Sequence, residues 1–191
     1  YPQFAMATTE TILVKAEEIR KKYFSKISIV DFPAFYNKPE YIKVLGDSLN
    51  EGLNGFNYDH LIFSYHGVPE RHILKSDITQ SHCKIDGQCC QSESASHKFC
   101  YRHQCYETTR LTAEYLQLKQ NSYTTTFQSR LGKDPWIQPY TDDTIENYAK
   151  NGIKKLAIIT PAFVSDCLET IEEIGMEAKE SFLEHGGESF H

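Results

Sequence analysis

Strand-like and helix-like segments alternate along most of this chain, and this order constrains the fold more than any other feature of the sequence. Strands that alternate with helices predict a parallel sheet with helices packed on both faces. We therefore predict a doubly wound α/β domain with about four parallel strands. The strand-like segments are residues 26–32, 61–65, 123–128 and 156–160, the last almost wholly apolar and therefore expected to be buried on both faces. The helix-like segments are residues 8–24, 39–53, 106–118, 141–152 and 165–185.

The length and charge of the chain narrow its class further. A length of 191 residues favours a single domain that spans 1–191, and no apolar run approaches the roughly 20 residues of a membrane-spanning helix. The net charge of −6 argues against a broad phosphate-binding face, so we expect no nucleic-acid partner. The chain opens at Tyr1 without an initiator Met or a signal peptide, and we interpret it as an intracellular, cytoplasmic fragment.

Two of the strand-like segments lead directly into reactive side chains. The segment 61–65 runs into His66, and the segment 156–160 runs through a short loop to Glu169, in the first turn of the final helix. Ligands of an open parallel sheet bind in the crevice beyond the carboxyl ends of its strands. We therefore expect His66 and Glu169 to face the same crevice, although a hydrogen-bonded histidine at the rim of the core is an equally good interpretation of His66 alone.

The final helix carries a row of carboxylates. Glu169, Glu173 and Glu177 follow one another at intervals of four residues, which places like charges on one face at a cost of roughly 0.2–0.5 kcal/mol for each pair. A divalent cation bound by His66, Glu169, Glu173 and Glu177 would offset that repulsion. A solvated acidic face softened by salt is the alternative.

A cysteine-rich stretch at about 72–105 has neither helical nor strand periodicity and is interpreted as an insertion. Its thiols could supply the four ligands of a zinc or iron–sulfur site, which would order the segment. Disulfides and free thiols in a loop are the alternatives. The candidate ligands are Cys83, Cys89, Cys90, Cys100 and Cys105.

Several motifs in a fixed order resemble one enzyme family. They are YPQF at 1–4 with a Thr pair at 8–9, SYHGVPER at 64–71, FQSRLG at 127–132, PW at 135–136 through PYTD at 139–142, and FVSDCLET at 163–170. Together they resemble ferrochelatase, the enzyme that inserts ferrous iron into a porphyrin to make haem. They are spread over nearly the whole chain, and only the cysteine-rich insertion lies largely outside the match.

The resemblance implies a chelatase fold of two similar domains around a porphyrin cleft, with this chain forming most of the second domain. It implies an absent first domain, a further strand and helix after His191, and a peripheral contact with a membrane. It also implies protoporphyrin IX and ferrous iron as substrates. By the same resemblance, His66 is the catalytic histidine, Glu169 its paired acid, and Glu173 and Glu177 part of a metal- or proton-carrying row on a helix with wide π-type turns. Trp136 matches a pocket aromatic, and we assign Tyr65 with it to porphyrin binding.

The chain also departs from the family pattern. Many members have His where this chain has Cys167, and Met6 replaces a cysteine that some members use for a [2Fe–2S] cluster together with C-terminal cysteines. Other bacterial members carry cluster cysteines in an internal segment, which the stretch from Cys83 to Cys105 resembles. Two rival interpretations stay open: a noncatalytic iron–sulfur or zinc module on an α/β scaffold, and a related chelatase that uses coproporphyrin or cobalt.

Overall fold

A computed structural model describes residues 1–191 and has a four-stranded sheet at its centre. The strands are β1 (His60–His66), β2 (Tyr123–Gln128), β3 (Lys155–Ile159) and β4 (Ser189–Phe190). Their order is β2-β1-β3-β4 and every neighbouring pair is parallel. The predicted parallel α/β class is confirmed, and β2 has the predicted bounds.

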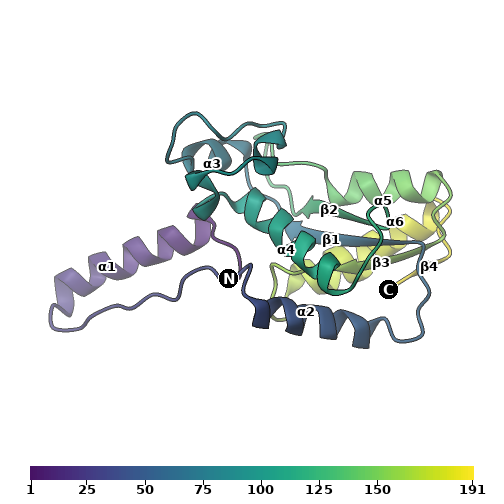
Figure 1. Ribbon diagram of the computed structural model, residues 1–191, viewed down its shortest axis with the longest axis horizontal. Helices are drawn as coiled ribbons and strands as arrows, with labels where there is room; N and C mark the ends of the chain where they lie inside the picture. The colour runs from purple at the N-terminus through teal and green to yellow at the C-terminus, as the bar shows by residue number, and fades with distance from the viewer.

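Helices cover both faces of the sheet (Figure 1). Successive side chains of a strand point to opposite faces, so β1 sends Phe63 and Tyr65 into the larger core and Ile62 into the smaller one. The larger core lies under α2 (Pro39–Gly52) and α4 (Tyr101–Tyr115), and the smaller core under α5 (Thr141–Lys150) and α6 (Lys179–Glu184). Burial of the predicted strand 156–160 is less complete than expected, since Ile158 and Ile159 are only half-buried.

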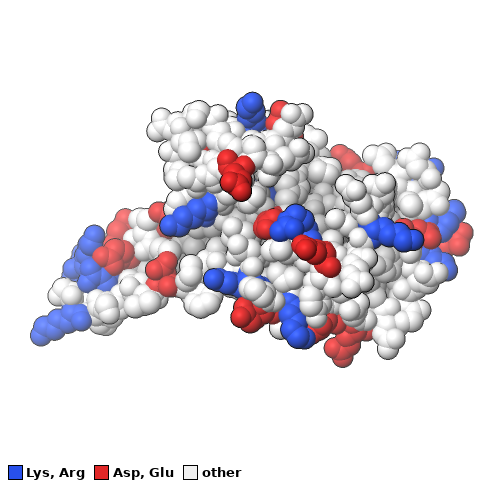
Figure 2. Space-filling model, in the orientation of Figure 1, with Lys and Arg blue, Asp and Glu red and all other residues white.

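The N-terminal segment forms an arm that projects from the body (Figure 1). It consists of a π-helical stretch, Met6–Glu10, the helix α1 (Thr11–Tyr23), and an extended return that reaches the body again near Phe35. The prediction of a strand at 26–32 was wrong: the segment is extended, but no strand lies beside it. Val30 and Phe32 are 89% and 79% exposed. Charged side chains of both signs cover the outer part of the arm (Figure 2).

The cysteine-rich segment has more structure than its sequence suggested. It contains α3 (Glu70–Lys75) and two short 3₁₀ helices, Gln88–Gln91 and Ala95–Lys98, and α4 begins at Tyr101, five residues earlier than predicted. A buried carboxylate organises the segment: Asp77 accepts hydrogen bonds from the backbone of Thr79, His82 and Cys83 and from the hydroxyls of Thr79 and Ser96. Side-chain hydrogen bonds thus replace the helical and strand periodicity that the sequence lacks.

The last helix begins at about Leu168, later than predicted, and its first part, Glu169–Ala178, is π-helical. The wide turns implied by the family resemblance are therefore present. A short strand that the sequence did not predict, β4, precedes His191 and pairs with β3. None of the helices is both long and apolar enough to cross a membrane.

Candidate functional site

His66 is the last residue of β1 and is held from two sides. Its Nδ1 lies 2.7 Å from the carbonyl oxygen of Gly67, and its own carbonyl accepts a hydrogen bond from the hydroxyl of Tyr101 at 2.8 Å. Since a carbonyl can only accept, Nδ1 carries the proton of the neutral imidazole and Nε2 is left as the basic nitrogen. A Cβ at Gly67 would lie 3.0 Å from the carbonyl oxygen of Gln128 and 3.1 Å from the Trp136 ring, so only glycine fits comfortably here.

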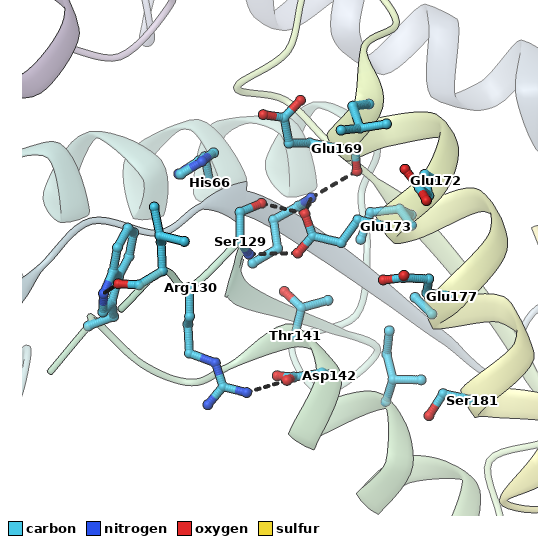
Figure 3. Close-up of a pocket in the computed structure, with 17 residues that line it drawn as sticks. His66, Ser129, Arg130, Thr141, Asp142, Glu169, Glu172, Glu173, Glu177 and Ser181 are labelled. Atoms are coloured by element: carbon cyan, nitrogen blue, oxygen red, sulfur yellow. Dashed lines mark hydrogen bonds and ion pairs between the residues drawn. The ribbon is translucent and has the colours of Figure 1, made fainter. Parts of the chain in front are cut away.

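Glu169 reaches the same place from the end of β3, at the start of the π-helix. It lines, with His66, a cavity of about 730 Å³ beyond the carboxyl ends of the strands (Figure 3). The strand topology predicts this meeting of residues that are far apart in the chain. Hydrogen bonds from its own backbone N–H and from Cys167 lower the pKa of Glu169, and the nearby His66 adds to the effect. The carboxyl group is therefore ionised at neutral pH.

A second, more apolar cavity of about 380 Å³ adjoins the first. His66, Trp136 and Glu169 line both cavities, so these side chains stand at the boundary between an acidic and an apolar space. The rings of Trp136 and Phe163 lie 6.2 and 6.3 Å from the His66 ring, centroid to centroid. Trp136 thus lies where it was expected, whereas the sequence gave no reason to single out Phe163.

Tyr65 does not line either cavity, and its assignment to porphyrin binding was wrong. Its side chain is fully buried in the larger core, and its hydroxyl lies 2.9 Å from that of Thr109. The reason is the alternation of the strand, which turns Tyr65 toward α4.

The carboxylates of the predicted row have different surroundings. Glu173 accepts hydrogen bonds from the backbone N–H of Ser129 at 2.6 Å, from the Ser129 hydroxyl and from Gln128 at 3.3 Å, as Figure 3 shows for Ser129. Ser129 has a left-handed backbone (φ 65°), and this turn aims its N–H at the helix. Glu177 and the unpredicted Glu172 line the cavity with exposed side chains. Glu173 is therefore an anchor between β2 and the π-helix, while its neighbours are free to meet an ion.

No group of three or more His, Cys, Asp or Glu side chains in the structure is close enough to hold a metal ion. The proposed set of His66, Glu169, Glu173 and Glu177 is thus brought to one cavity but not into one coordination sphere. Such an arrangement suits successive contacts with a mobile cation better than tight retention of one.

Two further residues of the crevice have no clear signal in the sequence. Arg130, the only Lys or Arg side chain on the acidic cavity, stacks on the Tyr140 ring at 3.9 Å and pairs with Asp142. His72 lines the apolar cavity, and its buried Nδ1 has no hydrogen-bond partner. Burial lowers the pKa of His72, as do the charges of Arg71 and Lys75.

The cysteines of the insertion are all unpaired, so the disulfide alternative is absent from the structure. Burial raises the pKa of Cys83 to about 11, and a hydrogen bond with Cys100 opposes that rise. A second hydrogen bond with Cys100, together with burial, raises the pKa of Cys90. The guanidinium of Arg102 donates to the sulfur of Cys89 at 3.4 Å. The donor chemistry therefore fits a four-thiolate centre held by Cys83, Cys89, Cys90 and Cys100, although the thiols would have to draw closer.

Cys105 differs from the other four. Like Cys83 and Cys100 it is buried in the larger core, but its side chain hydrogen-bonds with Tyr101 and not with another thiol. Burial raises its pKa well above the ordinary value. Of the five candidate ligands it is the one best explained by core packing.

The parallel α/β sheet thus places an imidazole and a carboxylate between an acidic and an apolar cavity. Comparison with known proteins gives the family: the ferrochelatase family pattern matches residues 1–191. A ferrochelatase of Pseudomonas fluorescens (strain Pf0-1) is 43% identical over 189 residues, which cover 98% of this chain and 55% of that protein. Ferrochelatases of Opitutus terrae and Coxiella burnetii (strain Dugway 5J108-111) are 40% and 43% identical and cover 100% and 99% of this chain. The chain belongs to the ferrochelatase family and spans about half the length of these curated relatives.

Proposed function

We propose that this chain is the metal- and proton-handling half of a ferrochelatase that inserts ferrous iron into protoporphyrin IX to form haem. The observation that carries the proposal is the position of His66 and Glu169 at the boundary of two cavities, one lined by carboxylates and one mainly apolar. A cation approaching through the first would meet a flat apolar ring in the second at these two side chains. Trp136 and Phe163 supply aromatic surface for that ring.

The chemistry requires a base at this boundary. Iron insertion replaces two pyrrole N–H protons by one Fe²⁺, so two protons must leave as the metal enters. His66 offers Nε2 as the nitrogen that can accept a proton there, because Nδ1 lies against the carbonyl oxygen of Gly67. The ionised Glu169 stabilises the imidazolium that forms, and the exposed Glu172 and Glu177 attract the cation and pass protons to solvent. Glu173 holds the π-helix against β2, which keeps Glu169 in place.

A matched pair of carboxylate variants tests this function. In the full-length enzyme, Glu169→Gln should slow haem formation from protoporphyrin IX and Fe²⁺ by at least tenfold, the lower range for one general acid–base or electrostatic group. Glu184→Gln, which removes an exposed carboxylate of α6 outside both cavities, should have little effect. Equal rates for the two variants would contradict the proposal. Supplying coproporphyrin or Co²⁺ in the same assay shows whether either replaces the proposed substrates.

We further propose that the arm packs on a preceding domain of similar fold. The spacing Pro-x-Phe-x5-Glu-Thr-Ile occurs at 2–12 and again at 161–171, and each copy enters a π-helical stretch. After the second copy the chain forms α6 and then β4, which pairs with β3. After the first copy it forms α1 and the extended segment 26–32, which has no neighbouring strand. The repeat therefore supports the proposal that 26–32 forms an edge strand in the sheet of the preceding domain.

Hydrogen exchange tests this partner. In the full-length protein, the amides of 26–32 should exchange at least a hundredfold more slowly than in the present chain, because pairing with a sheet protects them. Amides of β1 provide the control, since they are paired in both. Equally fast exchange of 26–32 in both proteins would contradict the proposal.

For the insertion we propose a resident [2Fe–2S] cluster held by Cys83, Cys89, Cys90 and Cys100. The support is the hydrogen bonding of Cys83 and Cys90 with Cys100, the position of the Cys89 sulfur beside Arg102 in the same segment, and the unpaired state of all four thiols. When bound, the cluster would order the segment and provide a redox-active centre. Iron and sulfide analysis of the full-length protein separates the cluster from a zinc site. Cys100→Ser should lose bound metal, whereas Cys105→Ser should keep it; the reverse pattern would refute this ligand set.

The abundance of unpaired thiols supports a location in the reducing cytoplasm. Peripheral contact of the whole enzyme with a membrane stays a prediction of the family resemblance.

A further inference from the structure

Arg102 is the largest side chain that is fully buried in this protein, with 2% of its surface exposed. Its guanidinium donates to the carbonyl oxygens of Ile85, at 2.7 Å, and Lys84, and to the sulfur of Cys89. Its Nε is buried and has no partner. The guanidinium therefore lies inside the insertion, against the turn that carries the thiols.

No carboxylate forms an ion pair with Arg102. Arginine stays protonated in proteins, and an unpaired charge in a buried position is strongly unfavourable. Carbonyl oxygens solvate a cation but do not neutralise it. Besides these carbonyls, the guanidinium contacts the sulfur of Cys89, one of the four proposed ligands.

Other polar groups nearby also lack partners. Of the five buried side-chain polar atoms without a hydrogen bond in the whole chain, three belong to this region: Nε of Arg102, Nε2 of His97 and Nδ1 of His103. His97 and His103 stack with ring centroids 3.5 Å apart. Buried polar atoms are normally satisfied, and of these three the Nε of Arg102 can only donate, so it points to a hydrogen-bond acceptor beside the guanidinium.

We propose that Arg102 is the counter-charge and hydrogen-bond donor of the thiolate centre of the insertion, and that it favours the more reduced state of that centre. The proposal rests on the cysteine site proposed above. Four thiolates around a [2Fe–2S] core give a net negative charge, which becomes more negative on reduction. A fixed cation in a poorly solvated position stabilises the added electron and makes the reduction potential less negative. Arg102 is thus a positioning residue and not a metal ligand.

Two variants of the full-length protein, purified without oxygen, test this role. Arg102→Met removes the charge and the donors but keeps a long side chain, whereas Arg102→Lys keeps the charge. Arg102→Met should weaken iron retention against a chelator by about 10- to 100-fold, the usual effect of losing an outer-shell partner, and make the reduction potential more negative. Arg102→Lys should retain more iron than Arg102→Met. Iron and sulfide per chain, an optical redox titration and circular dichroism are the readouts.

Ser96→Ala is the matched control. It removes a fully buried hydrogen bond to Asp77 in the same segment but touches no thiol, so it should leave the reduction potential unchanged. Wild-type retention and potential in Arg102→Met would overturn the proposal. Equal losses in all three variants would also overturn it, because Arg102 would then act only as a structural anchor. A wild-type protein without iron, sulfide or zinc would refute the cysteine site itself and Arg102's role with it. If the site holds zinc instead of iron, the zinc retained by Arg102→Met relative to the wild type tests the role of Arg102 as counter-charge.

Discussion

The crevice at His66 and the cysteine-rich insertion both contain metal-binding side chains, but the exposure and hydrogen bonding of these side chains differ between the two regions. In the crevice, Glu172 and Glu177 are exposed and Glu173 is fully engaged with Ser129 and Gln128. In the insertion, the thiols are largely buried and neighbouring polar atoms lack partners. The crevice leaves one buried polar atom without a partner, Nδ1 of His72, whereas the insertion leaves three, on His97, Arg102 and His103.

The difference fits the two uses of metal proposed above. Exposed carboxylates at a strand end exchange a hard cation readily, which suits an ion delivered to a substrate. Buried thiols next to an uncompensated guanidinium suit a group that enters once and stays. The burial and hydrogen bonding of metal-binding residues therefore indicate the kind of metal site better than their proximity alone.

Removal of metal should separate the two regions most strongly. Stripping the full-length protein with a chelator should raise the amide exchange rates of 77–100 by more than a hundredfold, because the bound group orders that segment. The amides of β1 and β2, which are held by the sheet, should change little. Uniform loss of protection, or none in the insertion, would remove the distinction between the regions.

Asp77 provides the next largest effect. Asp77→Asn should destabilise the insertion by about 3 kcal/mol, since a buried carboxylate would lose several charge-assisted hydrogen bonds. Although burial opposes it, hydrogen bonding from Ser96, Cys83 and Thr79 lowers the pKa of Asp77. A lowered folded-state pKa means that this stabilisation is complete at neutral pH and is lost as the pH falls below about 4 toward the folded value.

The acid sensitivity offers a separate check on Asp77. Limited proteolysis of the insertion at pH 7 and pH 3 should show acid-induced opening in the wild type and little further opening in Asp77→Asn. The same acid response in both proteins would show that another group controls the segment.

Within the crevice, two neighbouring carboxylates should behave differently. Glu173→Gln should lower the free energy of unfolding by about 1–2 kcal/mol, because it weakens the link between Ser129 and the π-helix. Glu177→Gln should change stability by less than about 0.5 kcal/mol, as an exposed surface substitution does. Thermal or denaturant unfolding of both variants measures this, and equal effects would mean that Glu173 is not an anchor.

Much of the fold followed from the sequence because its strands alternate with helices. The predicted segment 61–65 lies within β1, and the predicted segment 123–128 matches β2. The ends of β1 and β3 lead to His66 and Glu169. The segment 26–32 has the same alternation but no strand beside it. Alternating side chains indicate that a segment can form a strand, but they do not specify which strand it pairs with. Tyr65 was misassigned because proximity to His66 was given more weight than strand alternation.

Other features depended on contacts that no local pattern records. The early start of α4 lies in a Cys- and His-rich sequence with no helical period. Arg102, in the first turn of α4, donates to the carbonyl oxygen of Ile85, a contact between segments that the helical pattern does not record. The anchoring of Glu173 requires the left-handed turn at Ser129, some 40 residues away in the chain. The π-helix was expected only from the family resemblance, since spacing alone predicts a regular helix.

The most direct measurement examines both regions in a single variant, His66→Ala in the full-length enzyme. The rate of haem formation and the iron retained after dialysis against a chelator are measured on the same preparation, with His185→Ala as the control for loss of an imidazole outside the crevice. The account predicts a fall in haem formation of about 10²- to 10⁴-fold, with retained iron equal to that of the wild type. Near-normal haem formation, or loss of the retained iron together with activity, would contradict it.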